Sequence, residues 1–216
     1  MTLIVKDTSE ENFTKFPLPA PGTTQAVCCA IWDLGLQRTT YMGAEKIQHK
    51  VVIAWEITEV INAPDSEFHG KPYMLSKKYT MSLSEKANLR KDLESWRGLP
   101  FTADELKKSG FDLSKLYGAN CYLGIKHVPD QNDPDKVYAN VTALLPIPRG
   151  LAKIQPLRKA DEAPPKWVLE KIAQAVPAPT FEPPAAPVNG VDVNDAPDHT
   201  EKAPSVSTET EDDFPF

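Results

Sequence analysis

The chain has 216 residues, of which 41% are hydrophobic, 8% aromatic and 25% charged. This length is enough for one globular domain with a tail. A domain of this length can bury a large enough hydrophobic core to be stable without disulfide bonds or a bound metal. The number of cysteines is three, which is odd, and two of them are adjacent, so the sequence does not indicate a disulfide framework. No secretory signal and no apolar run long enough to span a bilayer is recognised. We expect a soluble, cytoplasmic protein.

Charge and proline content divide the chain near residue 159. Residues 1–159 contain 21 basic and 18 acidic residues, a net charge of +3, whereas residues 160–216 contain 3 basic and 12 acidic residues, a net charge of −9. Ten of the 21 prolines fall in the acidic part. This asymmetry is typical of a nucleic-acid-binding body with an acidic interaction tail, and it equally fits a folded domain with a solvating tail.

Five segments have the composition of β-strands. They are rich in β-branched and aromatic residues, and several alternate between apolar and polar side chains. The segments are residues 25–33, 47–58, 73–81, 121–128 and 137–145. Gly35 is predicted to end the first strand, and Pro146 and Pro148 to end the last.

A helical connection is predicted over residues 82–118, between the third and fourth strands. Two pairs of residues have the spacing of a capping box, in which two side chains satisfy each other's backbone amides: Ser82 with Glu85, and Thr102 with Glu105. An apolar stripe with helical spacing follows the first pair, and Gly98 stands where that helix should end. Asp112 is predicted to cap one more turn.

This order of elements predicts a mainly β protein with a helical insert. It matches the OB-fold, a five-stranded Greek-key barrel, with helices between strands three and four. The alternative is another α+β sheet with a helical insert. Residues 1–158 would form this OB-like domain and residues 159–176 a short helical extension. Residues 177–216 lack periodicity and are predicted to be a disordered, proline-rich acidic tail.

Basic and aromatic residues interleave along the predicted sheet, as a groove for single-stranded nucleic acid requires. The candidate nucleic-acid-binding residues are Arg38, Tyr41, Lys50, Trp55, Lys77, Lys78, Tyr79, Tyr122, Lys126 and Tyr138. Alternation places Tyr122, Lys126 and Tyr138 on the polar side of neighbouring strands. Trp55 fits either the core or a stacking platform. For the whole set, an ordinary solvated sheet face is the alternative interpretation.

The chain ends in a short acidic and aromatic tip, which consists of Asp212, Asp213, Phe214, Pro215 and Phe216. This tip resembles the end of single-stranded DNA-binding proteins (SSBs), especially divergent phage-encoded members. In that family an acidic run precedes an apolar residue, a proline and a terminal phenylalanine. The likeness covers the last six residues, and Phe214 stands where an aliphatic residue is more usual. It implies binding of single-stranded DNA in replication, recombination and repair, and recruitment of partner proteins by the tip.

Sequence motifs for catalysis are not found. There is no GxxxxGK[ST] phosphate loop, no GxSxG elbow and no cysteine or histidine spacing that indicates zinc. We therefore expect a non-catalytic protein that has no cofactor or bound metal and does not bind membranes. Whether it forms homo-oligomers is left open by the sequence. Two alternatives stay open: an OB-like protein-interaction adaptor in phage replication that does not bind DNA itself, and a metal-dependent nuclease.

Overall fold

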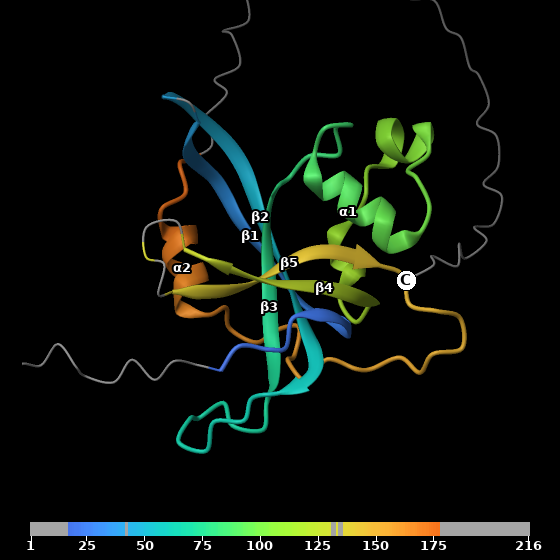
Figure 1. The fold of residues 1–216 in the computed structure, drawn as a ribbon. Helices are drawn as coiled ribbons and strands as arrows, with labels where there is room; N and C mark the ends of the chain where they lie inside the picture. Colours follow the sequence, from blue (N-terminus) through green and yellow to red (C-terminus); the bar gives the residue numbers. More distant parts are fainter. Residues whose placement is uncertain (1–16, 42, 131–132, 134–135, 178–216) are drawn as a thin grey trace, which may run out of the picture. The chain divides into compact units, whose positions relative to one another are not determined.

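The computed structural model describes residues 17–41, 43–130, 133 and 136–177. Five strands within them form one antiparallel sheet in the order β3-β2-β1-β4-β5 (Figure 1). The strands are β1 (Gly22–Tyr41), β2 (Ala44–Val60), β3 (Pro72–Thr80), β4 (Asn120–Pro129) and β5 (Val137–Leu145). The edge strands β3 and β5 approach each other, but no hydrogen-bonded ladder joins them in the described residues. The mainly β class and the five predicted strands are confirmed.

The hairpin of β1 and β2 is longer than predicted. The predicted end of the first strand at Gly35 is wrong, because β1 continues to Tyr41 through register shifts at Cys28/Ala30 and Asp33/Gly35. Gly35 has a φ of 67°, and its amide donates a hydrogen bond to Asp33 Oδ1 at 2.7 Å. A glycine in this left-handed conformation lets the strand bulge and then resume pairing.

The first helix begins later than its predicted capping box. α1 (Asn88–Arg97) starts after Ala87 and ends at Gly98, whose φ of 69° is the left-handed C-cap expected of glycine. Ser82 Oγ accepts a hydrogen bond from the Ser84 amide instead of capping a helix. The prediction of a Ser82–Glu85 capping box is therefore wrong, whereas the predicted end of the helix is confirmed.

Two shorter helical turns complete the connection to β4. They are the π-helix η1 (Glu105–Ser109) and the 3₁₀ helix η2 (Leu113–Leu116). The Thr102–Glu105 capping box is confirmed, since the Thr102 amide donates to Glu105 Oε2 at 2.7 Å and the Glu105 amide donates to Thr102 Oγ1 at 3.2 Å. Asp112 Oδ1 accepts from the Ser114 amide at 2.9 Å, as its predicted cap requires.

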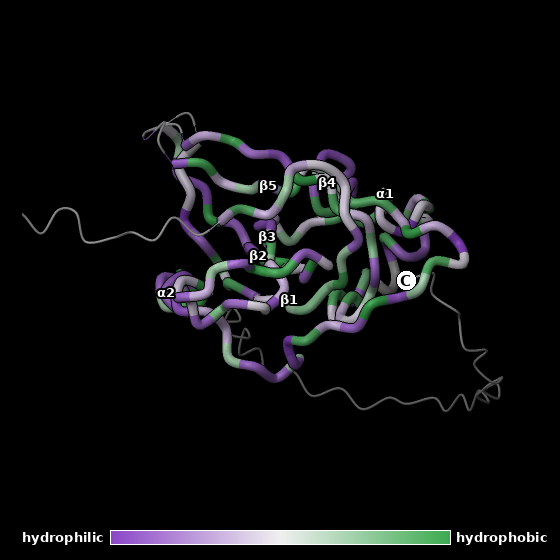
Figure 2. The backbone as a smooth tube through the Cα atoms, turned by 60° about the horizontal axis from the view of Figure 1, so that its bottom comes forward, coloured by the Kyte–Doolittle hydropathy of each residue, from purple (hydrophilic) through white to green (hydrophobic). Residues whose placement is uncertain are grey.

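Two apolar clusters lie on opposite faces of β1 and β2. The larger contains the inward residues of all five strands and the buried stripe of α1, which is Leu89, Leu93 and Trp96. The smaller contains Trp32 and Val52 from the strands and Val168 from α2 (Lys166–Ala173). α1 and α2 therefore cover opposite sides of the sheet (Figure 1). Hydrophobic and hydrophilic segments alternate along the strands in Figure 2, as expected for pleated strands.

Residues 150–177, which we call the strap, cross the outer face of β1 and β2. The Asn120 side chain bonds both backbone polar groups of Ile154 at 2.9 Å, and the buried Glu56 carboxylate accepts from the amides of Leu157 at 2.6 Å and Arg158 at 3.0 Å. These two buried polar side chains thus hold the strap on the sheet, because buried polar groups need hydrogen-bond partners. The strap ends on β1, where Val176 pairs with Leu36.

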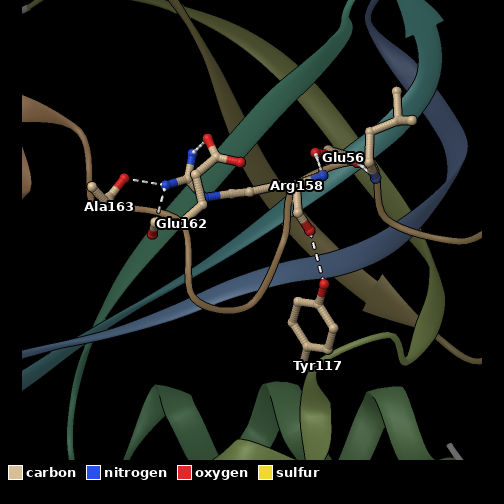
Figure 3. Close-up of polar contacts among 6 residues, drawn as sticks. Glu56, Tyr117, Arg158, Glu162 and Ala163 are labelled. Atoms are coloured by element: carbon tan, nitrogen blue, oxygen red, sulfur yellow. Dashed lines mark hydrogen bonds and ion pairs between the residues drawn. The ribbon is translucent and has the colours of Figure 1, made fainter.

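Arg158 is the central residue of the strap (Figure 3). Its carbonyl accepts a hydrogen bond from the Tyr117 hydroxyl at 2.8 Å, and its guanidinium pairs with Glu162 at 2.8 Å and donates to the Ala163 carbonyl. The guanidinium also lies 5.4 Å from the Trp32 ring. The helical extension predicted over residues 159–176 therefore packs on the body through a network that joins it to the sheet.

One predicted feature lies outside the described residues. It is the acidic tail at 177–216 apart from its first residue, and it includes the tip from Asp212 to Phe216. Within the described ranges, no helix combines the length and the apolarity needed to cross a membrane.

Candidate nucleic-acid interface

Lys126 and Tyr138 are exposed neighbours on the outer face of the β4–β5 ladder. Lys126 pairs in register with Asn140, and Tyr138 with Val128, so Lys126 and Tyr138 are diagonal neighbours on one face. The Tyr138 side chain is 50% exposed, and no acidic partner of Lys126 is found in the part of the chain that the structure describes. Tyr122 is half-buried on the same side of β4, nearer its other end. This face offers a cation beside an open aromatic ring.

A second cationic group lies on the outer face of β2 and β3. Lys50 pairs in register with Thr80, and Lys78 with Val52, so both lysines project from the side that carries the strap. Lys50 Nζ donates to Gln48 Oε1 at 2.8 Å and to Thr80 Oγ1 at 2.7 Å. Burial lowers the pKa of Lys50, and the neighbouring charge of Lys78 lowers it further.

Three predicted nucleic-acid-binding residues are turned toward the other side of the sheet. Trp55 is fully buried and packs on Trp96 with 5.9 Å between ring centroids. Tyr79 is also buried, and its hydroxyl donates to Asp92 Oδ2 at 2.8 Å, while Lys77 Nζ pairs with the same oxygen at 2.6 Å. Burial and the Asp92 charge raise the pKa of Tyr79. Trp55 is therefore a core residue, one of the two positions left open for it. The prediction that Tyr79 binds nucleic acid is wrong, because its ring is buried, and Lys77 is already paired with Asp92.

Arg38 lies apart from these groups, on the β1–β2 hairpin. Its guanidinium pairs with Glu45 at 2.8 Å, and the two side chains are 58% and 62% exposed. An exposed pair of this kind is worth only about 0–1 kcal/mol, so Arg38 is able to exchange Glu45 for a phosphate. Tyr41 ends β1, and its side chain is outside the described residues. The structure thus brings together Lys126 with Tyr138 and Lys50 with Lys78.

Sequence reasoning missed an apolar concavity of about 920 Å³ beside the strap. Its lining includes Phe68, Met74, Leu157 and Trp167, which are all exposed, and Lys71, whose ammonium lies 5.1 Å from the Phe68 ring. These residues come from a loop, an edge strand and the strap, so no local pattern connects them. The exposed rings suit either a nucleic-acid base or an apolar segment of a protein.

The three cysteines are buried and free. Burial raises the pKa of Cys29 to about 12 and also raises those of Cys28 and Cys121. A thiol that stays protonated at neutral pH is a poor nucleophile and a poor metal ligand. Cys28, Cys29 and Cys121 are therefore packed core thiols.

No protein-family model matches the chain, and no curated protein matches it. Its function is therefore inferred from the residues and from their positions in the fold.

Proposed function

We propose that this protein is a non-catalytic OB-fold protein that binds single-stranded DNA without sequence preference. Its role would be in DNA replication, recombination or repair, with the acidic C-terminal tip recruiting partner proteins. The observation that carries the proposal is made on the outer face of the β4–β5 ladder, where Lys126 lies diagonal to the exposed ring of Tyr138. Lys126 has no acidic partner among the described residues. Binding of unpaired strands needs this combination of a cation for phosphate and a ring for a base.

The strand order supports an OB-fold. β1, β2 and β3 follow one another as neighbours, and β4 returns through the helical connection to pair with β1. That spatial order, 4-1-2-3, defines a Greek key. The close approach of the two edge strands, β3 and β5, is what a partly open five-stranded barrel requires.

The acidic tip supports the recruiting role. Its aromatic residues follow two aspartates, so an apolar pocket rimmed by basic residues on a partner could bind the rings and the carboxylates together. The resemblance to the end of SSBs points to replication and repair proteins as such partners.

The test is a titration of the full-length protein into fluorescein-labelled oligo-dT, followed by fluorescence anisotropy at low and at moderate salt. Binding at low salt that weakens steeply as salt rises supports the proposal, because phosphate contacts release counterions. Absence of binding even in dilute buffer contradicts it. Incubation of the labelled strand with Mg²⁺ and gel analysis tests the nuclease alternative, which requires cleavage.

Two substitutions at Tyr138 identify the stacking platform. Tyr138→Ala removes the ring and should weaken binding by about 1–3 kcal/mol, the usual worth of one stacked base. Tyr138→Phe keeps the ring and should bind as the unmodified protein does. Equal binding by both variants would show that Tyr138 does not stack, and would remove the observation that carries the proposal.

The apolar concavity favours a second candidate function, a protein-interaction adaptor. Exposed apolar side chains around one concave surface, such as Leu157 at 73% and Trp167 at 43% exposure, are typical of contact sites for proteins. An adaptor would leave the anisotropy of oligo-dT unchanged at every salt concentration. The same titration therefore separates the two functions.

A further inference from the structure

A polar concavity of about 450 Å³ lies between β2, β3 and the segment that leads into α1. Lysines from three separate places in the chain line it, together with hydroxyl groups from the end of β3 and the following turn. These side chains are Lys50, Lys78, Lys86, Thr80, Ser82 and Ser84. No carboxylate is among the described residues that line it. The sequence-based prediction included Lys50 and Lys78 among the binding residues but not the hydroxyl groups.

The charges of these lysines are not compensated. The two hydrogen-bond acceptors of Lys50 Nζ, Gln48 and Thr80, are neutral, and Lys78 and Lys86 have no ion pair in the described part of the chain. The adjacent Lys77 differs, because it pairs with Asp92 at 2.6 Å. Like charges brought together without an acid repel one another, and an anion between them would relieve that repulsion.

The lowered pKa of Lys50 agrees with this arrangement. Its first cause is burial and its second is the positive charge of Lys78, so the two lysines are close enough to interact electrostatically. α1 also begins beside the concavity, at Asn88, and has no acidic residue in its first turn. The positive end of the helix dipole therefore adds to the potential that the lysines produce.

We propose that this concavity is a phosphate-binding site that holds a backbone phosphate of single-stranded DNA. The lysine ammonium groups would neutralise the phosphate, and the hydroxyls of Ser82 and Ser84 would donate hydrogen bonds to its oxygens. This inference rests on the proposed function and adds a defined anchor for the strand on β2 and β3. It assigns Lys86, in the turn before α1, a direct part in binding.

The test compares two lysine variants that remove the same charge. Lys86→Gln removes a cation that lines the concavity, whereas Lys91→Gln removes one from the exposed side of α1, outside the lining. Oligo-dT affinity is measured by anisotropy across a salt series. Lys86→Gln should lower the affinity about three- to tenfold at low salt and reduce the slope of log K against log salt by about 0.7, the value for one phosphate contact on a single strand. Lys91→Gln should change the slope little.

Unfolding curves in urea establish whether both variants are folded, and both exposed substitutions should leave the midpoint unchanged. If the unmodified protein binds oligo-dT and the two variants have the same salt slope, the phosphate site is wrong while the proposed function stands. If the unmodified protein does not bind oligo-dT, both fail.

Competition with inorganic phosphate and with thymidine monophosphate identifies the source of the phosphate. We expect both to displace oligo-dT only at concentrations far above that of the strand, because a strand makes additional contacts with the sheet. The assignment to DNA would be overturned by a different pattern. In that pattern the unmodified protein binds either small anion tightly, and Lys86→Gln loses this binding but still binds oligo-dT as the unmodified protein does.

Discussion

At the residue scale, two tryptophans in the same core differ in a single hydrogen bond. Trp55 and Trp96 are 0% and 1% exposed, and their rings pack against each other. Trp96 Nε1 donates to the Asn120 carbonyl at 2.9 Å, whereas Trp55 Nε1 has no acceptor among the described residues. Substitution of Trp96 loses both packing and a buried hydrogen bond, whereas substitution of Trp55 loses packing only. The same substitution should therefore cost more stability at Trp96.

We predict that Trp96→Phe destabilises the protein more than Trp55→Phe. Both variants lose ring volume, but Trp96→Phe also leaves the Asn120 carbonyl without this donor, an additional cost of about 1 kcal/mol. Urea unfolding followed by circular dichroism measures the two free energies of unfolding. An equal or larger loss in Trp55→Phe would contradict the prediction. Trp55→Phe should also leave oligo-dT affinity unchanged, since the ring is not on the surface.

The identity of inward residues was only partly predictable. Alternation alone gave the correct faces for Tyr122, Lys126 and Tyr138, because burial alternates along β4 from Cys121 to Lys126 and the pairing of Lys126 and Tyr138 lies beyond the register shift at Gly124/Ile125. It left β3 ambiguous, since Lys77 and Lys78 are adjacent and either could face outward. Asp92 decides between them: it lies on α1 and pairs with Lys77, and no sequence pattern indicates that long-range contact.

At the element scale, α2 buries a single side chain against the sheet. Val168 is the buried residue of this helix and is 0% exposed, whereas Leu169 beside it is 49% exposed. Trp167 adds an edge-to-face contact with Trp32, at 6.1 Å between ring centroids. A helix of eight residues is not stable alone in water, so its structure depends on this docking.

We predict that Val168→Asp releases α2 from the sheet and that Leu169→Asp does not. The first change buries a carboxylate in an apolar cluster without a partner, which costs roughly 2–4 kcal/mol, whereas the second places the same charge in solvent. Limited trypsin digestion should cleave Val168→Asp rapidly after Lys166 or Lys171 and leave the unmodified protein and Leu169→Asp protected. Equal cleavage of the two variants would show that Val168 does not anchor the helix.

The predicted boundaries of helices and strands agree with the structure where a local sequence signal sets them. They differ from the structure where contacts between distant residues set them. Thr102 and Glu105 form their capping box, but Ser82 and Glu85 have the same spacing and do not. The residues after Ser82 instead run beside Lys50 and Lys78 before the helix begins. Gly35 was predicted to end β1, yet its left-handed conformation is a bulge in a strand that continues because β2 pairs with it further on.

At the scale of the whole molecule, positive and negative charge are separated along the chain. Residues 1–159 carry a net charge of +3 and residues 160–216 carry −9. The lysines of the proposed interface, Lys50, Lys78, Lys86 and Lys126, have no acidic partners in the described part of the body. Because the acidic residues are covalently joined to the body, any competition between them and DNA does not weaken when the protein is diluted.

We predict that removal of residues 209–216 tightens oligo-dT binding at low salt and has little effect at moderate salt. The deletion removes acids that compete with DNA phosphate for the body, and salt screens that competition because the Debye length falls to about 10 Å at 0.1 M. Anisotropy titrations across a salt series measure the effect. The matched control is the double substitution Phe214→Ala and Phe216→Ala, which keeps every acidic side chain and should leave DNA affinity unchanged. Unchanged affinity of the truncated protein at every salt concentration would contradict the prediction, and a gain in the phenylalanine variant would show that the rings, not the charges, compete with the strand.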